Sequence, residues 1–176
     1  MMKDPLKREE NLFYLISPSR PVSKFVESMK AHVENTLGYR FKTHLSKPYL
    51  SLMRDSDKRA ERFLYDVENK VCSFKPFDVS VKNLNVFIQS NHKRTIYLDV
   101  VYKTPICEIF ETLTDKDIDF TPHITIAKNL EIDDFMKVWR DLKHVSYSNN
   151  FRCDHITVLK KSERKWIHYA DIPFNG

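Results

Sequence analysis

The sequence predicts an α+β fold of two related lobes packed about a pseudo-twofold axis, with a cleft between them. The octet KPYLSLMR at residues 47–54 is matched, position by position and without a gap, by TPHITIAK at 121–128. A helical pattern precedes each octet, and a helix and then a strand follow it. Because no linker or low-complexity segment separates the halves, both lobes are expected to share one core.

The first elements are a buried strand and a long helix. Residues 1–10 are polar and charged, which predicts a flexible tail, and residues 11–176 are expected to form a single domain. The run NLFYLIS at 11–17 is typical of a buried strand. Pro21 suits the first turn of a helix, and Gly38 suits its end. Apolar residues recur between them at helical spacing, at Val22, Phe25, Val26, Met29 and Val33.

The remaining elements follow from the same kinds of pattern. Residues 40–46 lead into the first octet as extended chain, and Asp55 or Ser56 is expected to cap the next helix. That helix directs inward the apolar residues Phe63, Leu64, Val67 and Val71. The later predictions are strands at 77–89 and 94–102 joined by a turn at Asn91-His92, helices at 105–113 and 132–145, and closing strands at 153–161 and 166–174.

The composition excludes several classes of protein and site. Of the 176 residues, 41% are apolar, which is enough for one core, and no apolar run reaches the roughly 18 residues of a membrane span. Two glycines exclude a glycine-rich phosphate loop, and three cysteines lack the paired spacing of a metal site. We therefore expect a cytoplasmic, monomeric protein without metal or cofactor. The net charge of +5 admits an anionic partner, although it also fits an ordinary basic protein.

Candidate functional side chains come from the alternation of faces along each octet. Successive strand side chains point to opposite faces, so His123 and Thr125 share one face and the isoleucines beside them share the other. In the first octet Tyr49 and Ser51 occupy the same places above two leucines. With the apolar face in the core, an imidazole, a phenol and two hydroxyls are expected to project into the cleft.

Such a set of side chains suits a phosphodiester. One histidine near its ordinary pKa can take a proton from an attacking hydroxyl or water, and a second can give one to the leaving oxygen. Hydroxyls and nearby cations can hold the non-bridging oxygens as charge builds. Arg54 and Lys128 follow their octets symmetrically and fit this phosphate-binding role, although they equally fit solvated residues at strand ends.

The run PHITIAK resembles the H-x-T-x signature of the two-histidine (2H) phosphoesterase superfamily, and KPYLSLMR resembles its partner motif with the histidine lost. The order of elements and the HITVLKK run resemble the branch called 2'-5' RNA ligase or RNA 2',3'-cyclic phosphodiesterase, over about residues 11–174. The resemblance implies a bilobal fold with two pseudo-symmetric lobes of antiparallel sheet, helices outside and a central cleft. It also implies metal-independent chemistry on cyclic or 2'-5' phosphodiesters.

The resemblance assigns roles residue by residue. His123 matches a catalytic histidine, and Thr125 and Ser51 match the phosphate-binding hydroxyls. Tyr49 stands where the second catalytic histidine belongs. An ordinary tyrosine has a pKa of about 10 and is a poor base at neutral pH, but it can donate a proton or a hydrogen bond. Packing or ligand stacking is the alternative interpretation for Tyr49, and a purely structural strand histidine is the alternative for His123.

Other histidines are weaker candidates. His155-Ile156-Thr157 repeats the H-x-T pattern, so His155 is either a possible substitute base or a chance match. His44 falls on the opposite face by simple alternation, which favours a surface or core role. The others are interpreted as surface or structural residues, namely His32, His92, His144 and His168.

Three functions remain open from the sequence. The first is a phosphodiesterase acting on an RNA end or small nucleotide with a 2',3'-cyclic or 2'-5' bond. The second is a catalytically decayed relative that binds such ligands without turnover. The third is an interaction domain in which the cleft is vestigial. Turnover separates the first function from the others, and saturable nucleotide binding separates the second from the third.

Overall fold

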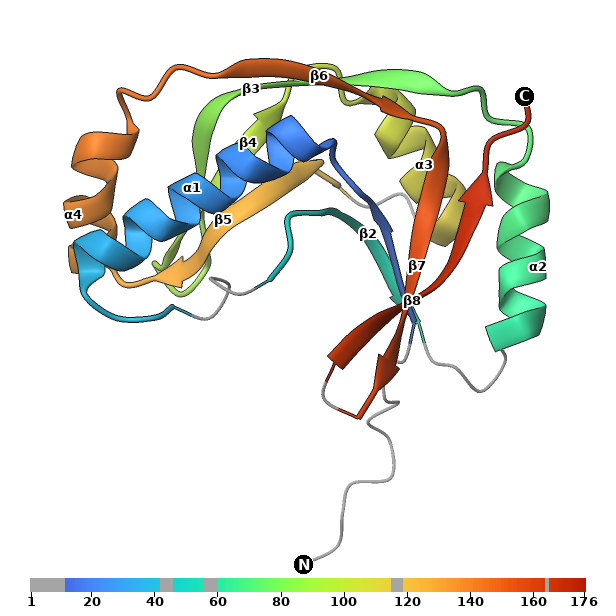
Figure 1. The fold of residues 1–176 in the computed structure, drawn as a ribbon, viewed down its shortest axis with the longest axis horizontal. Coiled ribbons are helices and arrows are strands. Elements are labelled where there is room, and N and C mark those ends of the chain that lie inside the picture. Colours follow the sequence, from blue (N-terminus) through green and yellow to red (C-terminus); the bar gives the residue numbers. More distant parts are fainter. Residues whose placement is uncertain (1–11, 42–45, 56–59, 115–118, 164) are drawn as a thin grey trace, which may run out of the picture.

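A computed structural model describes residues 12–41, 46–55, 60–114, 119–163 and 165–176. In these residues eight antiparallel strands form one curled sheet, in the order β6-β3-β4-β5-β2-β1-β7-β8, with four helices (Figure 1). The elements are β1 (Leu12–Ile16), α1 (Arg20–Leu37), β2 (Leu50–Asp55), α2 (Ala60–Val71), β3 (Phe77–Ile88), β4 (Arg94–Val100), α3 (Thr104–Thr114), β5 (His123–Leu130), α4 (Ile132–Leu142), β6 (Ser148–Cys153), β7 (His155–Ser162) and β8 (Lys165–Pro173).

The sheet has two halves that meet at the two octets. One half is β6-β3-β4-β5 and the other is β2-β1-β7-β8, and β2 pairs with β5 at their junction. The pair is Leu50 opposite Ile124, which are equivalent positions of the two octets. An antiparallel pair of equivalent residues places the pseudo-twofold axis between these two strands. The predicted bilobal α+β fold is therefore confirmed, and the two octets are neighbouring strands rather than separate walls.

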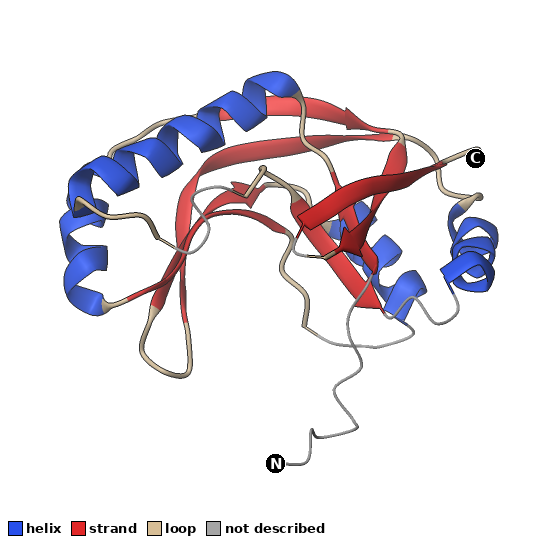
Figure 2. Ribbon diagram, turned by 60° about the horizontal axis from the view of Figure 1, so that its bottom comes forward, coloured by secondary structure: helices blue, strands red, loops and turns tan. Residues whose placement is uncertain are grey.

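The helices interlock the two halves. Helix α1 leads into β2 but packs against β5 and α4, whereas α3 leads into β5 but packs against β2 and α2. Figure 2 shows the helices along the outer side of the curled sheet. Because each leading helix covers the opposite half, neither half has a hydrophobic core independent of the other.

Burial follows the predicted alternation of faces. All five residues of β1 are buried, and so are Val22, Val26 and Val33 on α1. Leu50 and Ile124 are completely buried, while the polar residues beside them are only partly buried. The sheet therefore turns the apolar face of each octet toward the core and leaves the polar face toward its concave side.

The ends of several elements also agree with the sequence. Gly38 ends α1 with a left-handed φ of 73° and donates its amide hydrogen to the Glu34 carbonyl. The turn at Asn91-His92 is present, with His92 at a φ of 62° and its amide bonded to the Gln89 carbonyl. None of the described helices is long and apolar enough to cross a membrane.

Several details differ from the sequence prediction, including the end of the predicted helix 132–145, which lies at Leu142. Strand β6 was not predicted, because SNNFRC is polar and only Phe151 and Cys153 are buried along it; its backbone pairs with β3 at the sheet edge. Asp55 is the last residue of β2, and its predicted role as a helix cap stays a prediction. The first octet becomes a strand only at Leu50, so Tyr49 lies just before β2. Predictions on the tail, His44 and Ser56 lie outside the described residues.

Candidate active site

The polar faces of the two octets meet at the centre of the sheet. Leu50 and Ile124 are the paired residues, and extending this antiparallel register by one residue each way matches His123 with Ser51 and Thr125 with Tyr49. Directly opposed side chains on one face have Cβ atoms about 4.5–5.5 Å apart. The pseudo-symmetry thus brings one hydroxyl next to each ring.

A cavity of about 190 Å³ lies over this junction. Six of the seven predicted site residues line it, namely Tyr49, Ser51, Arg54, His123, Thr125 and Lys128. Ser46 and Lys47 complete the lining. The predicted hydroxyls, imidazole, phenol and cations therefore surround a single small space, and their chemical roles stay predictions.

His123 is held in one tautomer. Its Nδ1 lies 2.7 Å from the Thr121 carbonyl oxygen. A carbonyl can only accept a hydrogen bond, so Nδ1–H donates and Nε2 of the neutral ring keeps its lone pair. Phe87 and Tyr97 pack against the imidazole at steep angles, with ring centroids 4.9 and 5.3 Å away. This ring is oriented to accept a proton at Nε2.

Burial also lowers the pKa of His123. Loss of water around the ring is the largest cause, and Lys128 lowers it further, against the raising effect of the Thr121 carbonyl. The imidazole is therefore mostly neutral at pH 7, which is the state that a general base requires.

Tyr49 has a different environment. Its ring meets Phe13 edge-on, with centroids 5.0 Å apart and an interplanar angle of 88°. Phe13 also lies beneath the Arg54 guanidinium, whose central carbon is 4.7 Å from the ring centroid. Phe13 is buried, as the sequence predicted, but it also supports two of the residues around the cavity.

Lys30 is a residue at this site that the sequence analysis missed. Its side chain is buried on α1, and Nζ donates to the Ser46 carbonyl at 2.7 Å and to the Ser46 hydroxyl at 3.0 Å. Burial lowers the pKa of Lys30 to about 8. Because Ser46 lines the cavity, Lys30 anchors the segment that carries Lys47 and Tyr49. The sequence did contain an indication of this role, because Lys30 lies between Val26 and Val33 on the apolar face of the helix, where a charged residue is unusual.

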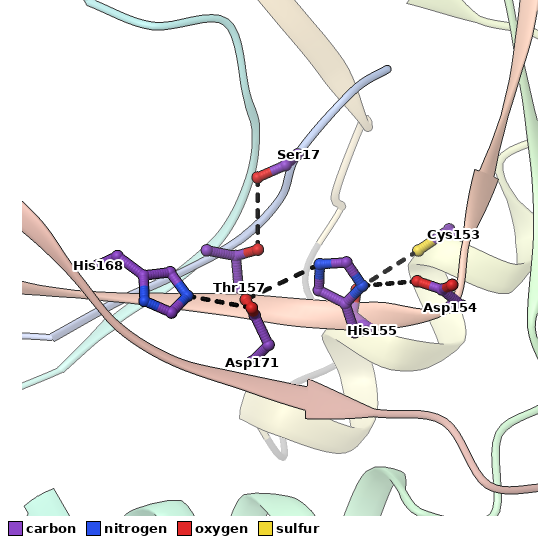
Figure 3. Close-up of polar contacts among 7 residues, drawn as sticks. All are labelled: Ser17, Cys153, Asp154, His155, Thr157, His168 and Asp171. Atoms are coloured by element: carbon purple, nitrogen blue, oxygen red, sulfur yellow. Dashed lines mark hydrogen bonds and ion pairs between the residues drawn. The ribbon is translucent and has the colours of Figure 1, made fainter. Parts of the chain in front are cut away.

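His155 lies apart from this cavity. It is on β7, with Nδ1 2.5 Å from the Asp154 carboxylate and Nε2 3.8 Å from that of Asp171 (Figure 3). It is not among the residues that line the cavity, so its role as a substitute base stays a prediction. In the described parts of the chain, no group of three or more His, Cys, Asp or Glu residues is arranged to hold a metal ion.

Comparisons with solved structures support the same fold. The crystal structure of TT0787 from Thermus thermophilus has a TM-score of 0.66 at 14% identity, covering 94% of this chain and 98% of that one. Apo LigT from E. coli has a TM-score of 0.68 at 10% identity, covering 95% and 98%. E. coli LigT complexed with 3'-AMP has a TM-score of 0.60 at 10% identity, covering 95% and 99%.

The sequence itself identifies the family. No curated protein matched the chain. The model of the 2'-5' RNA ligase superfamily matches residues 11–165, which include both octets and the H-x-T run of β7. The match confirms the resemblance to two-histidine phosphoesterases, and this chain belongs to the 2'-5' RNA ligase superfamily.

Proposed function

We propose that this protein is a metal-independent phosphodiesterase that acts on 2',3'-cyclic or 2'-5' phosphodiester bonds of RNA ends or small nucleotides. The observation that carries the proposal is the cavity whose lining includes His123, the hydroxyls of Ser51 and Thr125, and the cations of Arg54 and Lys128. E. coli LigT has been solved with 3'-AMP, ATP, NADP+ and phosphate, and its similarity in fold makes a nucleotide ligand reasonable here.

The chemistry follows from the positions of the side chains. Nε2 of His123 takes a proton from a water or hydroxyl as its oxygen attacks phosphorus. The Thr125 and Ser51 hydroxyls donate to the non-bridging oxygens, and Arg54 and Lys128 offset their negative charge. The bond from phosphorus to the leaving ribose oxygen breaks, and that oxygen takes a proton from the Tyr49 hydroxyl or from water. With water as nucleophile, the product of a cyclic phosphate is a monoester.

Tyr49 makes a low rate the expected outcome. A phenol is protonated at neutral pH, so it can serve as an acid but cannot replace a histidine in accepting a proton. The alternative function is a decayed relative that binds a nucleotide or RNA end in the same cavity without turnover. We place either function in the cytoplasm, since the three cysteines are free thiols, and in one domain over residues 11–176.

The test is incubation of the purified protein with a panel of nucleoside 2',3'-cyclic phosphates and 2'-5' dinucleotides, each with and without EDTA. The proposal predicts slow turnover that EDTA does not change, because the acid, base and hydroxyl groups around the cavity suffice. Saturable binding without turnover would favour the decayed relative. Activity lost in EDTA and restored by a divalent ion would reject the metal-independent mechanism.

A further inference from the structure

A carboxylate lies directly opposite His123 in the sheet. Strands β4 and β5 are antiparallel neighbours, and their register sets Asp99 opposite His123 and Tyr97 opposite Thr125. Opposed residues turn their side chains to the same face, with Cβ atoms about 4.5–5.5 Å apart. Asp99 therefore carries its negative charge on the face of the sheet that holds the proposed general base.

The carboxylate of Asp99 is held in place by two contacts. Its Oδ1 lies 3.1 Å from Lys103 Nζ and accepts a hydrogen bond from the Val100 amide at 2.9 Å. The Asp99 side chain is 27% exposed and that of Lys103 is 37% exposed, so the pair is only partly solvated. Its charges are screened less by water and salt than those of a fully exposed pair, and they can act on a neighbouring group.

Asp99 lies outside the cavity of the proposed active site. It is not among the residues that line the 190 Å³ cavity, and it lines instead a cavity of about 370 Å³ together with Lys103. The Tyr97 ring packs against the imidazole and stays protonated, because burial and the Asp99 charge both raise the pKa of Tyr97. Asp99 can therefore affect the reaction through the charge it presents to His123, and not by contact with substrate.

The other ionisable groups around His123 are cations and phenols. They are Lys47, Tyr49, Arg54, Tyr97, Lys103 and Lys128. Burial is the largest cause and lowers the pKa of His123, and Lys128 and Lys103 lower it further, whereas the Thr121 carbonyl and Asp99 raise it. When Nε2 takes a proton the ring becomes a cation, and Asp99 is the one anion among these groups that attracts it.

We propose that Asp99, held by Lys103, is a positioning residue that stabilises the imidazolium formed when His123 takes the proton from the attacking oxygen. The inference rests on the proposed function and adds a residue to its mechanism. Lys103 offsets part of the Asp99 charge, which keeps the imidazole neutral in the free enzyme. The pair thus balances two requirements of a general base, which must be unprotonated at the start and must hold a proton in the transition state.

The first experiment follows the imidazole signals of His123 by NMR as the pH is changed, with His123→Ala to assign them. Asp99→Asn should lower the midpoint of the titration by about 0.5–1 pH unit, less than the 1–3 units of a close pair, because the carboxylate is partly exposed and already paired. Lys103→Met should raise the midpoint, because it removes a cation and frees Asp99 from its partner. Asp78→Asn removes the same charge from a surface pair with Arg152 and should keep the wild-type midpoint.

The second experiment measures kcat/KM against pH for the same variants on the most active 2'-5' or 2',3'-cyclic substrate. The midpoint of the acid limb should move in the same directions as the NMR titration, and Asp99→Glu, which keeps the charge, should move it least. A merely structural role of Asp99 would lower the melting temperature and kcat/KM at every pH without moving this midpoint.

The two experiments separate the inference from the proposed function. If no substrate is turned over but the NMR midpoints of the two variants move in opposite directions, the proposed catalysis fails and the effect of the pair on His123 stands. An unchanged NMR midpoint in Asp99→Asn or in Lys103→Met, or a shift of both in one direction, would overturn the inference. NMR shifts that the acid limb of kcat/KM does not follow would remove Asp99 from the mechanism.

Discussion

The two octets have related backbones but different chemical surroundings. His123 begins strand β5, bonds to the Thr121 carbonyl and is enclosed by two aromatic rings. Tyr49 precedes β2 and packs against Phe13. Both line one cavity. The comparison teaches that fold symmetry does not require catalytic symmetry: one octet is suited to accept a proton, and the other presents an aromatic surface and a phenolic donor.

The largest expected effect is at the intact motif. His123→Ala should lower kcat/KM by about 10²–10⁴-fold, since it removes the group that accepts the proton. His92→Ala, at an exposed turn, is the control and should keep wild-type activity. The measurement is turnover of the most active substrate in the panel, with the melting temperature checked for each variant. Full activity in His123→Ala would remove this residue from the mechanism.

Tyr49→His should raise a low wild-type rate by about 10-fold or more, because imidazole near its ordinary pKa can hold either proton state at neutral pH. Tyr49→Phe keeps the ring beside Phe13 and removes only the hydroxyl, so it separates packing from proton donation. If wild type is already fast and both substitutions slow it, Tyr49 is a working acid or ligand contact.

Lys30 tests how the first octet is anchored. The pKa of Lys30 is about 8 in the folded protein and 10.5 in the unfolded chain. Between these two pH values the unfolded chain binds more protons than the folded protein. The free energy of unfolding of wild type therefore increases as the pH rises through this range. The unfolding free energy of wild type minus that of Lys30→Met should increase by about 2 kcal/mol from pH 7 to about 9.5. Lys24→Met, which removes an exposed charge from the same helix, should show no such trend.

The smallest effect is a shift in the pH profile. Burial lowers the pKa of His123 from 6.5, and kcat/KM reports the protonation of free enzyme. The acid limb of kcat/KM should therefore have its midpoint below about 6.5. A midpoint clearly above that value would mean that another group, or a protonated His123, governs the reaction.

Local periodicity predicted the centre of this site well. Alternation along two octets was sufficient to place His123, Thr125 and Ser51 on one face, because strand geometry has a period of two residues. Gly38 and Asn91-His92 were predictable for the same reason, since a helix end and a turn depend on nearby residues.

Features that depend on tertiary packing were not predicted. Lys30 is buried on α1, which packs against β5 in the opposite half of the sheet, and its ammonium group bonds to Ser46. Strand β6 carries polar residues and exists through its backbone pairing with β3. His168 was interpreted as a surface or structural residue, yet the β7–β8 pairing sets it opposite Leu159, and it lines a cavity of about 390 Å³ together with Thr157. No pattern in the sequence indicated that it would lie there.

The most direct test of the asymmetry between the octets is a kinetic cycle of four proteins: wild type, Tyr49→His, His123→Ala and the double variant. Each is assayed for kcat/KM on one 2'-5' or 2',3'-cyclic substrate in EDTA. The account predicts that Tyr49→His raises activity when His123 is present and that both proteins without His123 are equally inactive, because the side chain at position 49 serves the leaving oxygen and the attacking oxygen still lacks its base. A gain from Tyr49→His that persists without His123 would contradict the account.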